Sequence, residues 1–197
     1  KMNKIILNAN HLVINALTAI KNKNYIEAKN LLEKAISIQP EMFEANHNLA
    51  ILNFQLGNLD SSILYFEKSK KIKPKFSQVY FNLGLAYDRK KNIDLAIINF
   101  KKVIKLDPNN SIALYNIGHL YKKKLEPIKA EEYLSKSLDL NPNFIKTYDD
   151  LFSLYDQSNQ IEKFSNLLDK AKKILSVKDL VSFYEAVFTY NQKNFKQ

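Results

Sequence analysis

The fold is decided by the stretch SQVYFNLGLAYDRKKNIDLAIINFKKVIKLDPNN, residues 77–110. From Val79 onward its first half places apolar side chains three and four residues apart, which is the spacing of one face of an α-helix. A second stripe with the same spacing runs from Ile93 to Ile104. Asp107 precedes a proline, which disfavours helical backbone at that residue and ends the stripe. The stretch therefore predicts two helices joined by a short turn.

The same pattern recurs along the chain with a period of 34 residues. Four of the five prolines keep this spacing without a slip: Pro40, Pro74, Pro108 and Pro142. An asparagine series keeps the same phase: Asn48, Asn82 and Asn116. A period of this length is typical of stacked helix pairs. We expect five units at 9–42, 43–76, 77–110, 111–144 and 145–178, followed by a partial sixth at 179–197.

This pattern resembles the tetratricopeptide repeat family. The third unit carries the family's preferred residues at Tyr80, Leu83, Gly84, Tyr87, Ala96, Phe100 and Pro108, and the fourth at Leu114, Ile117, Gly118, Tyr121, Ala130, Leu134 and Pro142. The resemblance covers nearly the whole chain as a single array. It implies an all-α, right-handed superhelical solenoid of antiparallel helix pairs with a concave groove.

The fifth unit departs from the family pattern. Phe152 and Phe164 stand at two positions that the family fills with small residues, and Ser176 stands where proline is expected. Forcing a larger side chain into a close-packed position costs about 1–3 kcal/mol. We therefore expect the two helices of this degenerate unit to lie further apart than those of the third and fourth units.

The end of the chain falls inside a unit. Residues 179–197 resume the repeat and stop just before the second helix of that unit would pack. Repeat arrays normally end in a helix with a polar outer face, whereas this one would leave Phe183, Val187 and Phe188 partly covered. We expect the chain to be a truncated piece of a longer protein.

The composition narrows the classes of function. The absence of cysteine excludes disulfides, thiolate zinc sites and cysteine nucleophiles. Three glycines leave no phosphate-binding glycine-rich loop, and three histidines in different units suggest neither a metal site nor a catalytic triad. We expect no cofactor and no metal, and this chain is not expected to be an enzyme.

The net charge of +10 raises the question of an acidic partner such as nucleic acid or a membrane. Arg89 is the single arginine, although arginine is the preferred residue for phosphate and base recognition. The lysines are also spread along the chain, which favours solvated side chains over a nucleic-acid surface. No apolar run is long enough to span a membrane. Together with the absence of cysteine and of a signal sequence, this indicates a cytoplasmic protein without a membrane partner.

The resemblance also implies which residues line the groove, because in this family the first helix of each unit faces it. The candidates for partner binding are Asn48, Asn82, Asn116, Phe81, Tyr115, His119, Lys122, Lys123, Arg89 and Asp150. The three asparagines resemble the ladder of protein O-linked N-acetylglucosamine transferases, whose amides can donate to and accept from a peptide backbone. Alternatively, asparagine is simply common at this position.

The charged candidates also allow two interpretations. Basic residues of the fourth unit precede acidic residues of the fifth, which suits a bound peptide of mixed charge. The alternative is an ordinary solvated face.

Three functions follow from these observations. The first is a scaffold for protein–protein interaction that binds an extended peptide or a partner surface in its groove. The second is the substrate-recruiting N-terminal module of a larger enzyme, with a glycosyltransferase- or sulfotransferase-like domain after Gln197. The third is a self-assembling scaffold that associates through the truncated C-terminal helix.

Overall fold

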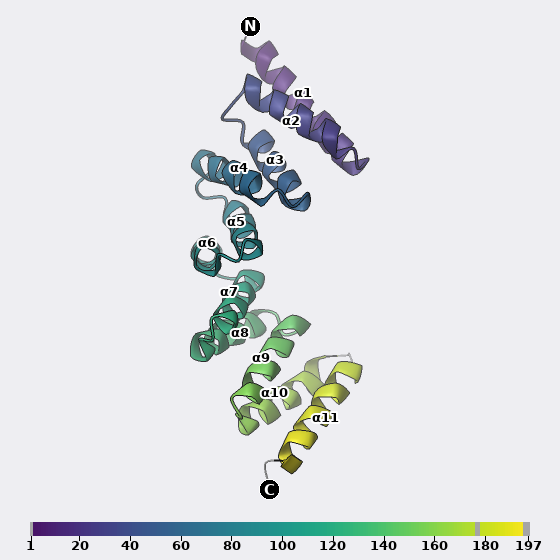
Figure 1. Ribbon diagram of the computed structural model, residues 1–197, viewed down its shortest axis with the longest axis vertical. Helices are drawn as coiled ribbons and strands as arrows, with labels where there is room; N and C mark the ends of the chain where they lie inside the picture. The colour runs from purple at the N-terminus through teal and green to yellow at the C-terminus, as the bar shows by residue number, and fades with distance from the viewer. Residues whose placement is uncertain (1, 176–177, 195–197) are drawn as a thin grey trace. The chain divides into compact units, whose positions relative to one another are not determined.

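The computed structural model describes residues 2–175 and 178–194. Within these residues the chain forms only α-helices and turns, which confirms the all-α fold class (Figure 1). The helices are α1 (Met2–Lys21), α2 (Tyr25–Ile38), α3 (Phe43–Gln55), α4 (Leu59–Ile72), α5 (Ser77–Arg89), α6 (Ile93–Leu106), α7 (Ser111–Lys123), α8 (Pro127–Leu140), α9 (Ile145–Gln157), α10 (Ile161–Ile174) and α11 (Lys178–Asn194). None of them is long and apolar enough to cross a membrane.

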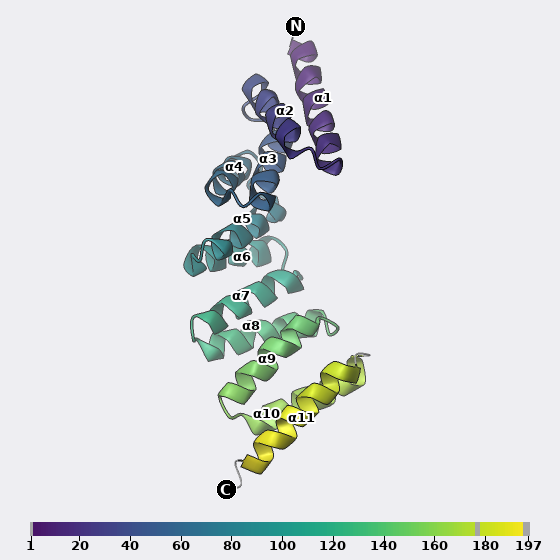
Figure 2. The same cartoon turned by 45° about the vertical axis from the view of Figure 1, so that its right-hand side comes forward.

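Consecutive helices pack as antiparallel pairs, from α1 with α2 to α9 with α10 (Figures 1 and 2). The two helices predicted within residues 77–110 are confirmed as α5 and α6. Pro127 begins α8, where its missing N–H leaves no helical hydrogen bond unmade. Helix α1 begins at Met2, well before the start of the first unit that the repeat predicts at residue 9.

The turn inside each pair repeats one backbone geometry. The second residue after the first helix has a positive φ in all five pairs: Lys23 (60°), Gly57 (81°), Lys91 (61°), Leu125 (58°) and Asn159 (53°). In the third pair the N–H of Lys91 donates to the carbonyl of Asp88 at 2.8 Å, and the N–H of Asn92 donates to the carbonyl of Tyr87 at 2.9 Å. These two bonds close the helix in the Schellman arrangement and reverse the chain.

Small residues set how closely two paired helices approach. A Cβ atom added to Gly84 would lie 2.7 Å from the Phe100 ring, and one added to Gly118 would lie 2.7 Å from Leu134. At the same place in the second pair, the buried hydroxyl of Ser62 donates to the carbonyl of Ala50 at 2.9 Å. The interior therefore tolerates only small side chains where these pairs cross.

The fifth pair is built differently. Phe152 of α9 and Phe164 of α10 meet with ring centroids 4.8 Å apart, and Tyr184 of α11 stacks on Phe152 at 4.0 Å. Two aromatic rings occupy the place that two small residues fill in the other pairs. The backbones of α9 and α10 approach each other closely at far fewer points than the backbones of the other pairs. This bears out the expected separation of the two helices. Ser176 lies outside the described residues.

The chain divides into two compact units, Lys1–Pro108 and Asn109–Gln197. In the first unit the interior side chains include Leu32, Leu49, Phe66 and Leu83. In the second they include Leu134, Tyr148, Leu151, Phe152 and Leu168. Each unit thus buries apolar side chains of its own. The single continuous array expected over residues 1–197 stays a prediction, and residues 195–197 of the partial sixth unit lie outside the described part.

Candidate functional site

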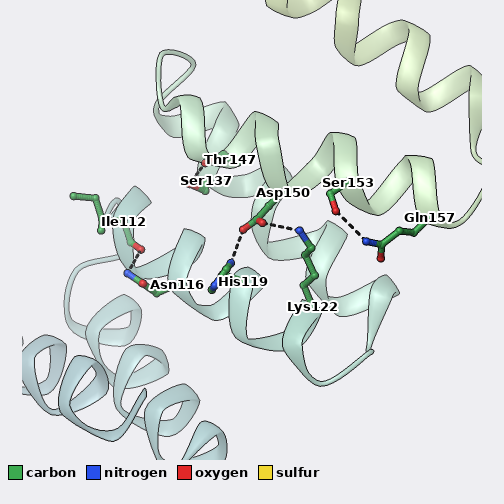
Figure 3. Close-up of polar contacts among 9 residues, drawn as sticks. All are labelled: Ile112, Asn116, His119, Lys122, Ser137, Thr147, Asp150, Ser153 and Gln157. Carbon is green, nitrogen blue, oxygen red and sulfur yellow. Dashed lines mark hydrogen bonds and ion pairs between the residues drawn. The ribbon is translucent and has the colours of Figure 1, made fainter. Parts of the chain in front are cut away.

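The three asparagines of the predicted ladder lie on α3, α5 and α7, the first helices of their pairs, and all three are half-buried. The side-chain amide of Asn48 donates to the carbonyl of Glu44 at 2.7 Å, and that of Asn116 donates to the carbonyl of Ile112 at 2.8 Å (Figure 3). The amide oxygen of Asn82 accepts from Gln78 at 3.1 Å. Because a carboxamide has two N–H donors and one accepting oxygen, each asparagine keeps at least one N–H for a partner.

The predicted aromatic residues lie beside the asparagines and are half-buried. The Phe81 ring meets Phe100 edge-on, with centroids 5.4 Å apart. The Tyr115 ring stacks on His119 at 5.7 Å and meets the Phe144 ring at 4.9 Å. Each ring therefore packs against other rings of the chain, while the residue as a whole remains partly accessible.

Arg89 connects two helices of the first unit. Its guanidinium donates to the carbonyl of Phe54 at 3.0 Å and lies 4.7 Å from the centroid of the Phe54 ring. A guanidinium stacks well on an aromatic face, so this contact ties the end of α5 to the end of α3. Lys123 occupies the same repeat position in the fourth 34-residue repeat, where it is exposed in the last turn of α7.

The structure brings His119, Lys122 and Asp150 together (Figure 3). Nδ1 of His119 lies 2.7 Å from Oδ2 of Asp150, and Nζ of Lys122 donates to Oδ1 of Asp150 at 2.7 Å. Asp150 is only 7% exposed. Burial by itself would raise the pKa of its carboxyl, but the hydrogen bonds and charges of His119 and Lys122 outweigh burial and hold that pKa below its usual value.

We call His119, Lys122, Asp150 and the adjoining Tyr115 the Asp150 cluster. Burial, reinforced by the carboxylate of Asp150, raises the pKa of the Tyr115 hydroxyl. The hydroxyl is therefore protonated at neutral pH and remains a hydrogen-bond donor. Both carboxylate oxygens of Asp150 already have partners on α7, so Asp150 joins α9 to α7 and orients the two basic side chains.

Sequence reasoning did not select His47, which lies on α3 at the repeat position that Phe81 and Tyr115 occupy in later pairs. Its ring stacks on Phe43 at 5.1 Å and meets Phe76 edge-on at 5.9 Å. Burial, followed by the charge of Lys73, lowers the pKa of His47. Its Nδ1 is buried and has no hydrogen-bond partner among the described residues. The shared repeat position was the signal that could have identified it.

Helix α11 exposes one aromatic side chain and packs another against α10. Phe183 is 59% exposed, whereas Phe188 stacks on Phe164 with centroids 5.5 Å apart. The predicted self-association through this helix stays a prediction.

Among the described residues, no group of three or more His, Asp or Glu side chains is placed to hold a metal ion.

Sequence models described as tetratricopeptide repeat match residues 77–110 and 111–144, and another with the same description matches residues 19–83. The chain belongs to the tetratricopeptide repeat family. The expectation drawn from the prolines, the small residues and the aromatic residues is thereby confirmed. No curated protein sequence matches the chain.

Solved structures of other tetratricopeptide repeat arrays resemble this one. MamA 41-end from Desulfovibrio magneticus RS-1 is 20% identical, with a TM-score of 0.76, and the match covers 86% of this chain and 98% of that one. YrrB, described as a TPR protein with an unusual peptide-binding site, is 15% identical, with a TM-score of 0.74 and coverages of 89% and 90%. The pilF protein of Pseudomonas aeruginosa is 19% identical, with a TM-score of 0.72 and coverages of 98% and 93%. At these identities the likeness shows the fold.

Proposed function

We propose that this tetratricopeptide repeat protein is an interaction scaffold that binds an extended peptide or a partner surface along the first helices of its pairs. The observation that carries the proposal is the set of half-buried asparagines on α3, α5 and α7, each with an N–H left over for a partner. An extended peptide presents carbonyl oxygens at regular intervals, and side-chain amides can donate to them irrespective of the peptide's sequence.

The residues around the asparagines would supply selectivity. Phe81 and Tyr115 each have a partly accessible ring that can cover an apolar side chain of the partner. Lys122 uses one donor on Asp150 and has further N–H groups for a carboxylate or carbonyl of the partner. In this proposal Asp150 positions His119 and Lys122, because both of its oxygens have partners within the chain.

A solved relative supports a peptide as the ligand class. YrrB is described by its peptide-binding site, and its fold matches 89% of this chain. Arg89 and Lys123 extend the proposed surface toward the ends of α5 and α7.

The proposal is tested with peptides selected by this protein from a displayed library of random twelve-residue sequences. The triple variant Asn48→Ala, Asn82→Ala and Asn116→Ala should bind the selected peptides at least about tenfold more weakly by isothermal titration calorimetry. A loss of one to two net hydrogen bonds corresponds to roughly that factor.

The matched control replaces three exposed asparagines outside the proposed surface, Asn30, Asn109 and Asn143, with alanine. Both triple variants should unfold at a denaturant concentration close to that of the original chain. If the control weakens binding as much as the ladder variant, or if the ladder variant binds unchanged, the asparagines do not hold the peptide.

A further inference from the structure

Two pockets occur at the same place in the repeat, two repeat lengths apart. The α4–α6 pocket has a volume of about 450 Å³ and lies in the first compact unit between α4, α5 and α6. The α8–α10 pocket has a volume of about 380 Å³ and lies in the second unit between α8, α9 and α10. Tyr87 and Lys102 of the first pocket correspond in the repeat to Tyr155 and Lys170 of the second. The two pockets can therefore be compared residue by residue.

The chain itself supplies carboxylates to the α8–α10 pocket. Glu131 accepts a hydrogen bond from the Tyr155 hydroxyl at 3.1 Å and an ion pair from Lys163 at 2.6 Å. Asp139 forms an ion pair with Lys170 at 3.3 Å. A tyrosine and two lysines of this pocket thus hold two carboxylates of the chain.

The α4–α6 pocket lacks both of these carboxylates. At the repeat positions of Glu131 and Asp139, the second 34-residue repeat carries Ile63 and Lys71. Four lysines line this pocket, Lys70, Lys101, Lys102 and Lys105, against one carboxylate, that of Glu67, which pairs with Lys70. Lys102 lies with Nζ 5.7 Å from the centroid of the Tyr80 ring. Tyr87 and Lys102 stand where Tyr155 and Lys170 contact carboxylates in the α8–α10 pocket, whereas Leu95 stands in place of Lys163. Lysines outnumber carboxylates in the lining of the α4–α6 pocket.

We propose that the α4–α6 pocket binds the carboxylates of an acidic segment of a partner protein. The segment takes the place that Glu131 and Asp139 take in the α8–α10 pocket. The Tyr87 hydroxyl donates as Tyr155 does, and Lys102 pairs as Lys170 does. The lining comes from the second helices α4 and α6, apart from Tyr80 and Tyr87 of α5, and it shares no residue with the surface proposed above.

The chemistry of the lining favours carboxylate over phosphate. The pocket contains no arginine, the residue whose planar donors match a phosphate bidentately. In the α8–α10 pocket, the residues at the same two repeat positions, Tyr155 and Lys170, each contact one oxygen of a single carboxylate. Lys102 and Lys105 of α6 both line the α4–α6 pocket, so two acidic side chains of one segment can pair at once.

The test uses a fluorescein-labelled peptide of six glutamates, with a six-glutamine peptide as reference, and fluorescence anisotropy of the whole chain. Lys102→Glu should weaken binding of the glutamate peptide at least about tenfold, the loss expected for one charge-assisted hydrogen bond. Lys34→Glu changes the net charge equally at the same repeat position outside the pocket, and it should leave binding within about twofold.

The second part of the test is a variant that should gain a binding site for the glutamate peptide. The double variant Glu131→Gln and Asp139→Asn removes the chain's own carboxylates from the α8–α10 pocket. It should add a second binding site for the glutamate peptide, seen as a doubled stoichiometry in calorimetry. The Asn48, Asn82 and Asn116 triple alanine variant should bind the glutamate peptide unchanged, so that this proposal and the preceding one fail separately.

Three results would overturn the proposal. Equal losses in Lys34→Glu and Lys102→Glu would show general attraction to a basic chain. Binding of a single-stranded oligonucleotide that depends on Lys102, without binding of the glutamate peptide, would assign the pocket to phosphates. A loss of the glutamate peptide in the triple asparagine variant would place it on the first helices.

Discussion

The carboxylate of Asp150 is buried on α9, and its two oxygens are held by His119 and Lys122 of α7. Its repeat position carries asparagine in the three preceding units. Whereas the side-chain amides of Asn48 and Asn116 donate to their own helices, Asp150 binds a neighbouring helix. The same position of the repeat therefore serves a different purpose in the fifth unit.

We expect Asp150→Asn to lower the free energy of unfolding by about 1–3 kcal/mol, because it leaves two basic side chains without their buried counter-charge. Urea unfolding at pH 7 measures this difference, with the exposed Asp169→Asn as control. The pKa of Asp150 is lowered in the folded protein, so its contribution is present above about pH 4 and disappears as the pH falls through the folded pKa. The gap between the two proteins should narrow on acidification. A gap below roughly 0.5 kcal/mol at pH 7 contradicts this role.

At the scale of the helix pair, one small residue sets the approach of two helices. In the third pair Gly84 lies against Phe100, and in the fourth Gly118 lies against Leu134. The two sites differ in what a larger side chain would meet. A Cβ at position 84 would meet ring atoms, whereas at position 118 it would also lie 3.0 Å from the backbone nitrogen of Leu134. A side chain can shift more easily than the backbone of a helix.

We therefore expect Gly118→Ala to destabilise the protein more than Gly84→Ala. Overpacking costs about 1–3 kcal/mol, and the better helix propensity of alanine offsets about 1 kcal/mol of it. Gly84→Ala should lie near the low end of the remaining cost and Gly118→Ala near the high end. The midpoints of urea unfolding at constant slope give both values. An equal effect at the two sites would show that α8 shifts as readily as the Phe100 ring.

At the scale of the whole molecule, the chain consists of two compact units that each bury a set of apolar side chains. In repeat proteins each repeat contacts mainly its neighbours, so stability is close to a sum of local contributions. A unit made of complete helix pairs keeps nearly all of these contributions when it is separated from the rest.

We expect a fragment of residues 1–108 to fold by itself. Its far-ultraviolet circular dichroism should be helical, and urea should unfold it in one cooperative step with a smaller slope than the whole chain. A shorter fragment of residues 1–89 removes α6 and uncovers Gly84 and the buried face of α5, so it should unfold at a lower urea concentration. The absence of a cooperative transition in the longer fragment would show that the first unit depends on the second.

The sequence by itself determined the helices, their pairing and the small residues between them. This information is local: apolar spacing, the proline after the second helix and the glycines of the third and fourth units all act within one repeat of 34 residues. It also identified the fifth unit as different, since two phenylalanines cannot fill the space of two small residues. The groove residues followed from the family rather than from physical reasoning on single positions.

The tertiary structure alone decided which polar groups meet. It joined Asp150 to His119 and Lys122, turned the amides of Asn48 and Asn116 toward their own helices, and placed Glu131 beside Tyr155. Several of these contacts join residues about one repeat apart in the chain. Their formation depends on side-chain rotamers and on distances between helices to within an ångström or so, which the spacing of residues in a sequence does not specify.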